Sequence, residues 1–309
     1  MQSDVLVRVL LGDPSPLIAG RYLADGYVQL ISASSSEYCE DLLAKCVASD
    51  VDLVIPVFDG EFAALAAARP QFESAGVRVA IASPEAIAQC RDKHKTGELF
   101  ARLGLGRPTT YSESEARSLS ADAYPLFLKP ADGRGSLGIA RVDFPADLDR
   151  HLTTMEAPVI QECIEGADIS EITIDCLSDL DGNFVACLPR ERQVIKAGQS
   201  YKGLSFRDAE IESACRLLCE ALHLAGPSCI QCFRTPEGPL FIEINPRFGA
   251  ASVLAMAAGL NGPAYLACQV ANKTPAVPAP RSGIQMLRYW QEVFVDLEQD
   301  VALDAVKLR

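Results

Sequence analysis

Residues 125–143 read Pro-Leu-Phe-Leu-Lys-Pro-Ala-Asp-Gly-Arg-Gly-Ser-Leu-Gly-Ile-Ala-Arg-Val-Asp. The apolar runs at the two ends, 125–129 and 139–143, predict β-strands joined by a loop with the pattern Gly-x-Gly-x-x-Gly. In dinucleotide-binding proteins this pattern leads from a strand into a helix, whereas here a second strand follows it. A glycine-rich β-hairpin instead predicts a flap whose backbone N–H groups can cover nucleotide phosphates, as in kinases. An ordinary hairpin without a ligand is the alternative.

Lys129 ends the strand that enters this glycine loop. Its ammonium group is therefore expected beside the phosphates that the loop would cover. In protein kinases the lysine follows the glycine loop, and this sequence contains neither His-Arg-Asp nor Asp-Phe-Gly. The order of the motifs disfavours a kinase.

A second motif, Phe-Ile-Glu-Ile-Asn-Pro-Arg at residues 241–247, predicts a metal site. Strand alternation places Glu243 and Asn245 on one face. If residues 235–239 form a five-residue hairpin loop, Gln231 on the preceding strand lies opposite Glu243. Three oxygen donors suit magnesium, which uses one or two carboxylates and completes its shell with phosphates and water. A solvated polar sheet face is the alternative, and a shift of one residue in register would move Gln231 to the other face.

Composition and charge narrow the classes of protein to consider. With 309 residues, of which 49% are hydrophobic, the chain can fold into about two compact domains. The net charge of −13 repels phosphate backbones and anionic lipids, which disfavours nucleic acid and membranes as partners. No signal peptide is predicted, and no apolar run approaches the roughly 20 residues that span a bilayer. A cytoplasmic protein is expected.

The chain is expected to combine α/β and α+β segments. Residues 1–90 alternate β-branched runs with amphipathic stretches, which predicts a small domain with a parallel sheet. Its expected strands are residues 5–10, 27–31, 51–57 and 77–81, and its expected helices are residues 37–48 and 60–69. Beyond it, further strands are expected at residues 159–163, 169–177, 184–188, 229–233 and 240–244, and helices after Ser83, near Asp92 and at residues 207–222.

The eleven cysteines are expected to be reduced core residues, because they lack the spacing of a disulfide framework. Cys229 and Cys232 form a Cys-x-x-Cys pair, but alternation along a strand points the two thiols to opposite faces. A zinc or redox pair is therefore disfavoured.

Arg190 and Arg192 are two residues apart, so on a strand both would point to one face, where an anionic substrate could bind. Lys196 follows closely. A solvated basic patch is the alternative.

Taken together, these motifs resemble those of ATP-grasp proteins. Lys93 in Arg-Asp-Lys, Lys129 with its glycine flap, the segment Gln-Glu-Cys-Ile-Glu-Gly at residues 161–166 and the segment Glu-Ile-Asn-Pro-Arg at residues 243–247 occur in this order in that family. The chain is most similar to stand-alone relatives of the carbamoyl-phosphate synthase large chain and to amino-acid ligases such as the lysine ligase of pyrrolysine synthesis. The resemblance covers nearly the whole chain.

The resemblance implies an ATP-grasp fold preceded by a small parallel-sheet domain. The implied segments are residues 1–90 for that first domain, residues 91–156 for a small lobe with the flap, and residues 157–309 for a large lobe with the metal site. Relatives begin with an additional strand and a glycine-bearing turn, so the first domain is expected to be truncated. After Arg247 relatives carry a run of glycines, whereas Gly249 is followed here by two alanines, so the substrate end is expected to differ.

The resemblance also implies roles for the matching residues. The residues implied in ATP binding are Lys93, Lys129, Gly135, Ser136, Gln161, Glu162, Cys163, Ile164, Asp168 and Lys196. The residues implied in metal binding are Gln231, Glu243 and Asn245. The residues implied in substrate binding are Arg190, Arg192 and Arg247, and those implied in catalysis are Arg247 and Lys129.

In this scheme Lys93 and Lys129 bind the α- and β-phosphates, with Lys95 as the alternative to Lys93. The flap residues cover the phosphates. The segment at 161–164 holds adenine between the lobes, and Asp168 binds the ribose. Arg247 stabilises charge on the transferred phosphoryl group.

The implied function is an ATP-dependent carboxylate–amine ligase that uses Mg²⁺ or Mn²⁺ and an acyl-phosphate intermediate. The expected partners are a small carboxylate and a small amine, and a homodimer or a partner subunit is compatible with the sequence. One alternative is a subunit that phosphorylates bicarbonate or carbamate, as in carbamoyl-phosphate synthase. The other is a regulatory subunit that binds ATP without turning it over.

Overall fold

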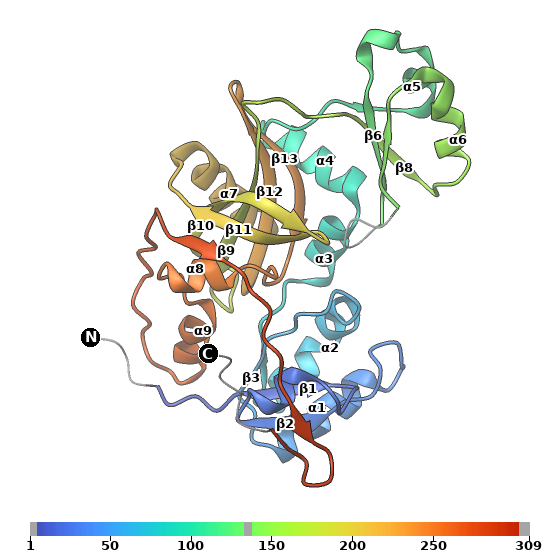
Figure 1. The fold of residues 1–309 in the computed structure, drawn as a ribbon. Coiled ribbons are helices and arrows are strands. Elements are labelled where there is room, and N and C mark those ends of the chain that lie inside the picture. Colours follow the sequence, from blue (N-terminus) through green and yellow to red (C-terminus); the bar gives the residue numbers. More distant parts are fainter. Residues whose placement is uncertain (1–4, 133–137, 303–309) are drawn as a thin grey trace. The chain divides into compact units, whose positions relative to one another are not determined.

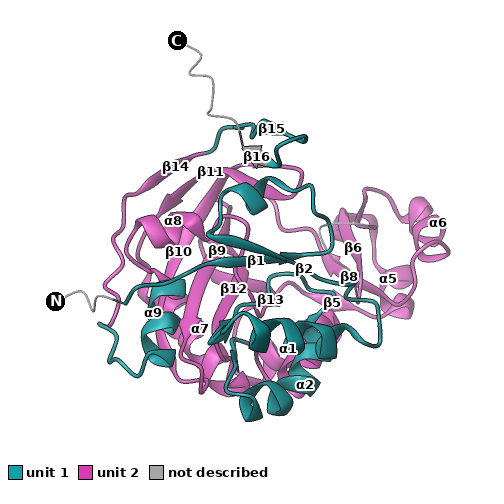
Figure 2. Cartoon of the chain, turned by 90° about the horizontal axis from the view of Figure 1, so that it is seen from below, with its two compact units in different colours: residues 1–80, 263–276, 288–309 teal, residues 81–262, 277–287 magenta. Residues whose placement is uncertain are grey.

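The computed structural model describes residues 5–132 and 138–302, which form two compact units (Figures 1 and 2). Unit 1 contains residues 1–80, 263–276 and 288–309, and unit 2 contains residues 81–262 and 277–287. All the candidate site residues except those outside the described ranges belong to unit 2.

Unit 1 contains two pairs of parallel strands with helices between them, which confirms the expected α/β character. β1 (Leu10–Asp13) runs parallel to β2 (Gly26–Gln29), and β3 (Leu53–Val54) runs parallel to β4 (Arg78–Val79). The remaining elements are η1 (Ala19–Tyr22), α1 (Tyr38–Ala48), α2 (Phe62–Ser74), most of α9 (Gly262–Val270), β15 (Val295–Asp296) and β16 (Val301–Ala302).

The expected first strand, residues 5–10, is wrong except at its last residue. The strand begins at Leu10 because β2 pairs with residues 10–13. Leu6, Val7 and Val9 are exposed and belong to no strand. A run of apolar residues predicts a strand, but it forms one only where a neighbouring strand accepts its hydrogen bonds.

The first part of unit 2 begins with two helices, α3 (Pro84–Arg91) and α4 (Lys93–Arg102). A four-stranded sheet follows, in the order β5-β8-β6-β7. Its strands are β5 (Thr110–Tyr111), β6 (Leu126–Pro130), β7 (Ala140–Val142) and β8 (Pro158–Glu162). β6 and β7 are antiparallel, as the sequence predicts for the two strands that flank the glycine loop. Short helices complete this part: α5 (Glu113–Ser118), η2 (Ala121–Ala123), η3 (Pro145–Asp147) and α6 (Leu148–Leu152).

The second part of unit 2 is a six-stranded sheet in the order β13-β12-β9-β10-β11-β14. Its strands are β9 (Ser170–Ser178), β10 (Phe184–Lys196), β11 (Gln199–Ser205), β12 (Pro227–Thr235), β13 (Gly238–Asn245) and β14 (Gln285–Leu287). The helices α7 (Ala209–Leu222) and α8 (Val253–Ala257) belong to this part, and Figure 1 shows α7 beside β10 and β12. Cys176 on β9 contacts Cys215 and Cys219 on α7, so this helix covers one face of the sheet.

The strand expected at residues 184–188 is longer in the structure, where β10 spans Phe184–Lys196. The strand β11 was not predicted. β10 continues to Lys196 and returns as β11, with Lys196 paired to Gln199. The two residues between them, Ala197 and Gly198, both have positive φ, as the tightest hairpin turns require. This hairpin is rich in charged and polar residues, so it lacks the apolar run from which strands were predicted.

All eleven cysteines are free, as predicted, and all except Cys39 and Cys163 are buried. Within the described ranges, none of the helices is long and apolar enough to cross a membrane.

Candidate active site

One face of the six-stranded sheet carries polar side chains that the sequence singled out. Glu243 on β13 lies opposite Gln231 on β12, Gln231 lies opposite Thr173 on β9, and Thr173 lies opposite Arg190 on β10. Residues directly opposite each other on neighbouring strands point to the same face. Two candidate metal ligands, Glu243 and Gln231, and a candidate substrate arginine therefore share a row across four strands, and Asn245 lies opposite Cys229 on the same face.

The candidate metal ligands offer one carboxylate and two amide groups. Glu243, Gln231 and Asn245 are each half-buried. In the described residues, no group of three or more His, Cys, Asp or Glu side chains is placed to hold a metal ion. The donor set still fits Mg²⁺, because this ion commonly takes its remaining ligands from water and from the phosphates of a substrate.

Lys129 brings a buried positive charge to this group. Its side chain projects from the end of β6 and is only 9% exposed. Burial lowers the pKa of the Lys129 ammonium to about 8, the Glu243 carboxylate opposes this shift, and the Lys93 ammonium adds to it. Glu243 and Lys93, which come from two other elements, therefore both lie within electrostatic range of the Lys129 ammonium. An ammonium held where water is scarce attracts phosphate oxygens strongly.

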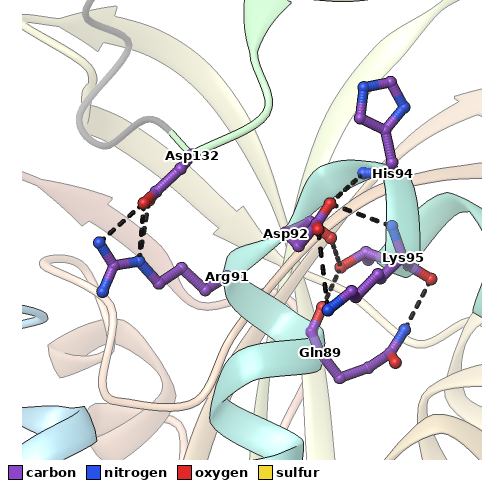
Figure 3. Close-up of polar contacts among 7 residues, drawn as sticks. Gln89, Arg91, Asp92, His94, Lys95 and Asp132 are labelled. Carbon is purple, nitrogen blue, oxygen red and sulfur yellow. Dashed lines mark hydrogen bonds and ion pairs between the residues drawn. The ribbon is translucent and has the colours of Figure 1, made fainter. Parts of the chain in front are cut away.

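Lys93 is the first residue of α4, and the start of this helix is tied to the end of β6. Its N–H donates to the carbonyl of Ala131 at 3.2 Å. Arg91 also donates twice to the Asp132 carboxylate, from Nε and from Nη2, with the Nη2 bond at 2.7 Å (Figure 3). These links fix the backbone that carries Lys93 relative to the strand that carries Lys129.

Asp92 caps α4, as the sequence predicts. Its Oδ1 accepts hydrogen bonds from the N–H groups of His94 at 2.9 Å and Lys95 at 3.2 Å (Figure 3). The Lys93 N–H is occupied by the Ala131 carbonyl, so Lys93 would have to bind phosphate through its side chain. Lys95 is exposed and lies 4.0 Å from the Asp92 carboxylate. The flap residues Gly135 and Ser136 lie outside the described residues, so their role stays a prediction.

The segment expected to bind adenine uses its first two side chains within the four-stranded sheet. Gln161 is buried and donates through Nε2 to Thr110 Oγ1 at 3.1 Å. The Glu162 carboxylate accepts a hydrogen bond from the N–H of Thr109 at 2.7 Å. Both side chains are therefore engaged by the neighbouring strand and the residue that precedes it.

The rest of that segment is more open. Cys163 and Ile164 are half-buried, and Asp168 is exposed. The Cys163 thiol lies near the ion pair between Arg141 and Glu165. This ion pair links β7 to the residues that follow β8.

The two candidate substrate arginines both have carboxylate partners. Arg190 is 3% exposed and donates from Nε to Asp175 Oδ2 at 2.8 Å. Burial would lower the pKa of the Arg190 guanidinium, but the Asp175 carboxylate outweighs it and the pKa is raised. Arg192 forms an ion pair with Glu171. Neither guanidinium offers an uncompensated positive charge to an anion.

Lys196, a candidate for nucleotide binding, lies at the exposed end of β10. Its ammonium lies 4.0 Å from the centre of the Tyr201 ring, in a cation–π contact across the β10–β11 hairpin. The Lys196 ammonium therefore contacts a residue of its own hairpin.

Arg247 lies two residues after Asn245 and turns back toward it. Its Nη2 donates to Asn245 Oδ1 at 3.3 Å, and its Nη1 donates to the Phe248 carbonyl at 3.1 Å. Both Arg247 and Glu243 influence the pKa of Cys229, which burial raises to about 12. The guanidinium therefore lies at the same face of the sheet as the candidate metal ligands.

The sequence prediction missed Asp175, which lies on this face next to Cys229. A signal for it is present in Glu171-Ile-Thr-Ile-Asp175, where polar and apolar residues alternate as they do in the strand that carries the candidate metal ligands.

Comparison with known proteins adds two family matches. Residues 90–251, more than half of the chain, match a family described as the ATP-grasp domain. Residues 2–80 match a family described as the PylC-like N-terminal domain.

Two relatives illustrate how far the similarity extends. The chain is 27% identical to a D-alanine–D-alanine ligase of Corynebacterium diphtheriae over 224 residues, covering 63% of this chain and 60% of the ligase. It is 30% identical to the carbamoyl phosphate synthase large chain of Thermotoga neapolitana over 193 residues, covering 56% of this chain and 17% of the synthase. The chain thus spans less than two thirds of the length of these two relatives.

Solved structures show the same fold. The structure of N5-carboxyaminoimidazole ribonucleotide synthetase with ADP matches with a TM-score of 0.68 at 14% identity, over 89% of this chain and 73% of that one. Biotin carboxylase from Campylobacter jejuni, bound to an ATP analogue, matches with a TM-score of 0.67 at 16% identity, over 87% of this chain and 66% of that one.

Proposed function

We propose that this chain, which belongs to the ATP-grasp family, is an ATP- and Mg²⁺-dependent ligase that joins a carboxylate to an amine. The proposal rests on one observation above all: buried Lys129 lies within electrostatic range of Glu243 and Lys93, and Glu243 stands two residues before Asn245, which accepts a hydrogen bond from Arg247. Two ammonium groups next to oxygen donors suit a polyphosphate and its metal ion. The relatives named as D-alanine–D-alanine ligases support an amine and a carboxylate as the substrates.

The proposed reaction has two steps. A carboxylate oxygen attacks the γ-phosphorus of ATP, the bond from that phosphorus to the bridging oxygen breaks, and ADP leaves with the electron pair. The amine nitrogen then attacks the acyl carbon, phosphate leaves, and the nitrogen loses a proton. Phosphorylation is needed because a carboxylate oxygen is a poor leaving group, whereas phosphate is a good one.

Each candidate residue has a task in this scheme. Lys93 and Lys129 would hold the α- and β-phosphates, while Glu243 with the neighbouring amides would hold Mg²⁺, which would neutralise charge on the phosphates. Arg247 would stabilise the negative charge that moves onto the transferred phosphoryl group. A cytoplasmic setting, with small-molecule substrates, is part of the proposal.

A substrate screen tests the proposed function. The purified chain is mixed with Mg²⁺, ATP and a library of amino acids, and ADP, phosphate and product masses are measured. We expect ADP and phosphate to appear in equal amounts with a product in which a carboxylate and an amine are joined. Products from bicarbonate and ammonia alone would favour the carbamoyl-phosphate type of reaction. Tight ATP binding without ADP release in any mixture would favour a regulatory subunit.

Replacing Lys129 with alanine should weaken ATP binding by about tenfold or more, because the buried ammonium would no longer contact the phosphates. Isothermal titration calorimetry measures the dissociation constant for ATP. Lys202→Ala is the control, because Lys202 is an exposed lysine on β11. We expect its affinity to stay within about twofold of the parent.

The melting temperature of the Lys129→Ala protein should change little, since the substitution removes a buried charge rather than a packed apolar group. Unaltered ATP affinity in a folded Lys129→Ala protein would contradict the assignment of Lys129 to the nucleotide.

A further inference from the structure

A buried polar network crosses the sheet next to the candidate active site. Arg190 Nε donates to Asp175 Oδ2 at 2.8 Å, and Arg190 Nη1 donates to Ser200 Oγ at 2.9 Å. The other oxygen of Asp175 accepts a hydrogen bond from Ser252 Oγ. Each of these four residues is at most 5% exposed. A buried ion pair persists only where its remaining polar atoms also have partners, and here the two serines supply them.

Ser252 extends this network into the loop that follows the metal-binding strand. The N–H of Gly249 donates to Ser252 Oγ at 2.8 Å, and the N–H of Ser252 donates to the Gly249 carbonyl at 3.0 Å. Phe248, which precedes Gly249, accepts the hydrogen bond from Arg247 Nη1. A continuous path of contacts therefore leads from Asp175 in the centre of the sheet to the guanidinium of Arg247.

Gly249 lets this loop lie against the sheet. A Cβ atom built at this position would lie 2.8 Å from Cys229 Sγ, closer than real Cβ contacts. A side chain here would require either the loop or the Cys229 sulfur to shift. Cys229 is 3% exposed, and Gly249 lies against its thiol.

We propose that Asp175 and Ser252 are positioning residues that hold residues 246–252 against the sheet, so that the Arg247 guanidinium stays beside Asn245. In this arrangement Arg190 neutralises Asp175 and does not bind a substrate anion. The inference rests on the proposed function for the task of Arg247. Its structural part, the attachment of the loop, can be tested separately.

Two serine variants provide a matched comparison. Ser252 and Ser200 are both 3% exposed, and each contacts one member of the ion pair, but only Ser252 reaches the loop. We expect Ser252→Ala to lower the ATP-dependent turnover about tenfold while the KM for ATP stays within about twofold. We expect Ser200→Ala to change both values less than about twofold. Equal losses in both variants, or a raised KM with unchanged turnover in Ser252→Ala, would overturn the proposal.

Alkylation of Cys229 tests the attachment of the loop without any substrate. The native variants are treated with iodoacetamide, and modified peptides are quantified by mass spectrometry. We expect Cys229 to react about tenfold faster in Ser252→Ala than in Ser200→Ala or the parent, because the loop would open more often. Cys232 is buried on the opposite face of β12, near Cys215 of α7, so its labelling reports global unfolding.

The two parts of the inference fail separately. Unchanged Cys229 labelling in Ser252→Ala would overturn the attachment, whatever the enzyme does. Faster labelling in a chain that never turns over ATP would leave the attachment standing and reject the proposed function.

A second variant covers the case in which Ser252→Ala does not fold. Gly249→Ala should lift the loop through its contact with the Cys229 sulfur, with the same loss of turnover at constant KM. The double variant Gly249→Ala with Cys229→Ala should recover most of that loss, because removing the sulfur makes room for the new methyl group. Additive losses in the double variant would contradict the proposed close approach.

Discussion

Replacing Glu243 with glutamine is expected to lower ATP turnover by about a hundredfold or more, while the protein stays folded. Glu243 supplies the one carboxylate among the candidate metal ligands, and glutamine keeps its shape without the negative charge. The Glu243 carboxylate also raises the pKa of Lys129, so the substitution removes a negative charge that favours the charged form of this lysine. The measurements are steady-state turnover over a range of Mg²⁺ concentrations and the melting temperature.

Glu237→Gln is a suitable control, because Glu237 is exposed in the turn of the same β12–β13 hairpin. We expect it to retain parental turnover and the parental requirement for Mg²⁺. Full activity of Glu243→Gln in excess chelator would remove the metal assignment altogether.

The predicted pairing of Glu243 with Gln231 is present, but the hairpin loop that leads to it differs from the predicted one. A five-residue loop at 235–239 was expected, whereas Thr235 and Gly238 are paired across a tighter turn. Ile242 is an extra residue in β13, between the pairs Gln231–Glu243 and Cys232–Phe241. This β-bulge shifts the register back by one residue, so the tight turn and the bulge together give the predicted pair. The bulge has no clear sequence signal, whereas Pro236 and Gly238 occupy the positions at which a four-residue turn favours proline and glycine.

Features set by neighbouring residues were predictable, because their causes lie within a few positions. The cap of α4 by Asp92 and the pairing of β6 with β7 on either side of the glycine loop are examples. The ion pair of Arg91 with Asp132 joins residues 41 positions apart, so only the folded chain reveals it. Long-range partners depend on how the elements pack, which periodicity does not encode.

The two arginines on β10 that were expected to bind substrate also depended on a long-range partner. Alternation along β10 placed Arg190 and Arg192 on one face, and the pairing of β10 with β11 agrees with this. Their charges were expected to face a substrate, but Asp175 and Glu171 on the next strand neutralise them. The sequence between 171 and 175 carries the alternation that would have predicted an acidic strand on the same face. Which strand lies beside β10 was the missing information.

Replacing Arg247 with alanine is expected to lower turnover by about a hundredfold or more, with the KM for ATP nearly unchanged. The reason is its position: the guanidinium lies beside Asn245, at the face where charge would build up on the transferred phosphoryl group. An interaction that forms mainly in the transition state affects turnover more than ground-state binding. Steady-state kinetics with a substrate pair from the screen measures both constants.

Arg247→Lys distinguishes a guanidinium requirement from a simple need for positive charge. Arg247 now contacts Asn245 Oδ1 and the Phe248 carbonyl through two separate nitrogens, and a lysine ammonium cannot span both. A guanidinium can also hold two oxygens of a phosphoryl group at once, whereas an ammonium acts as a point charge. Lysine should therefore restore only part of the turnover. If Arg247→Ala instead raises the KM for ATP while turnover holds, Arg247 binds the nucleotide in the ground state, and its role in the transition state is wrong.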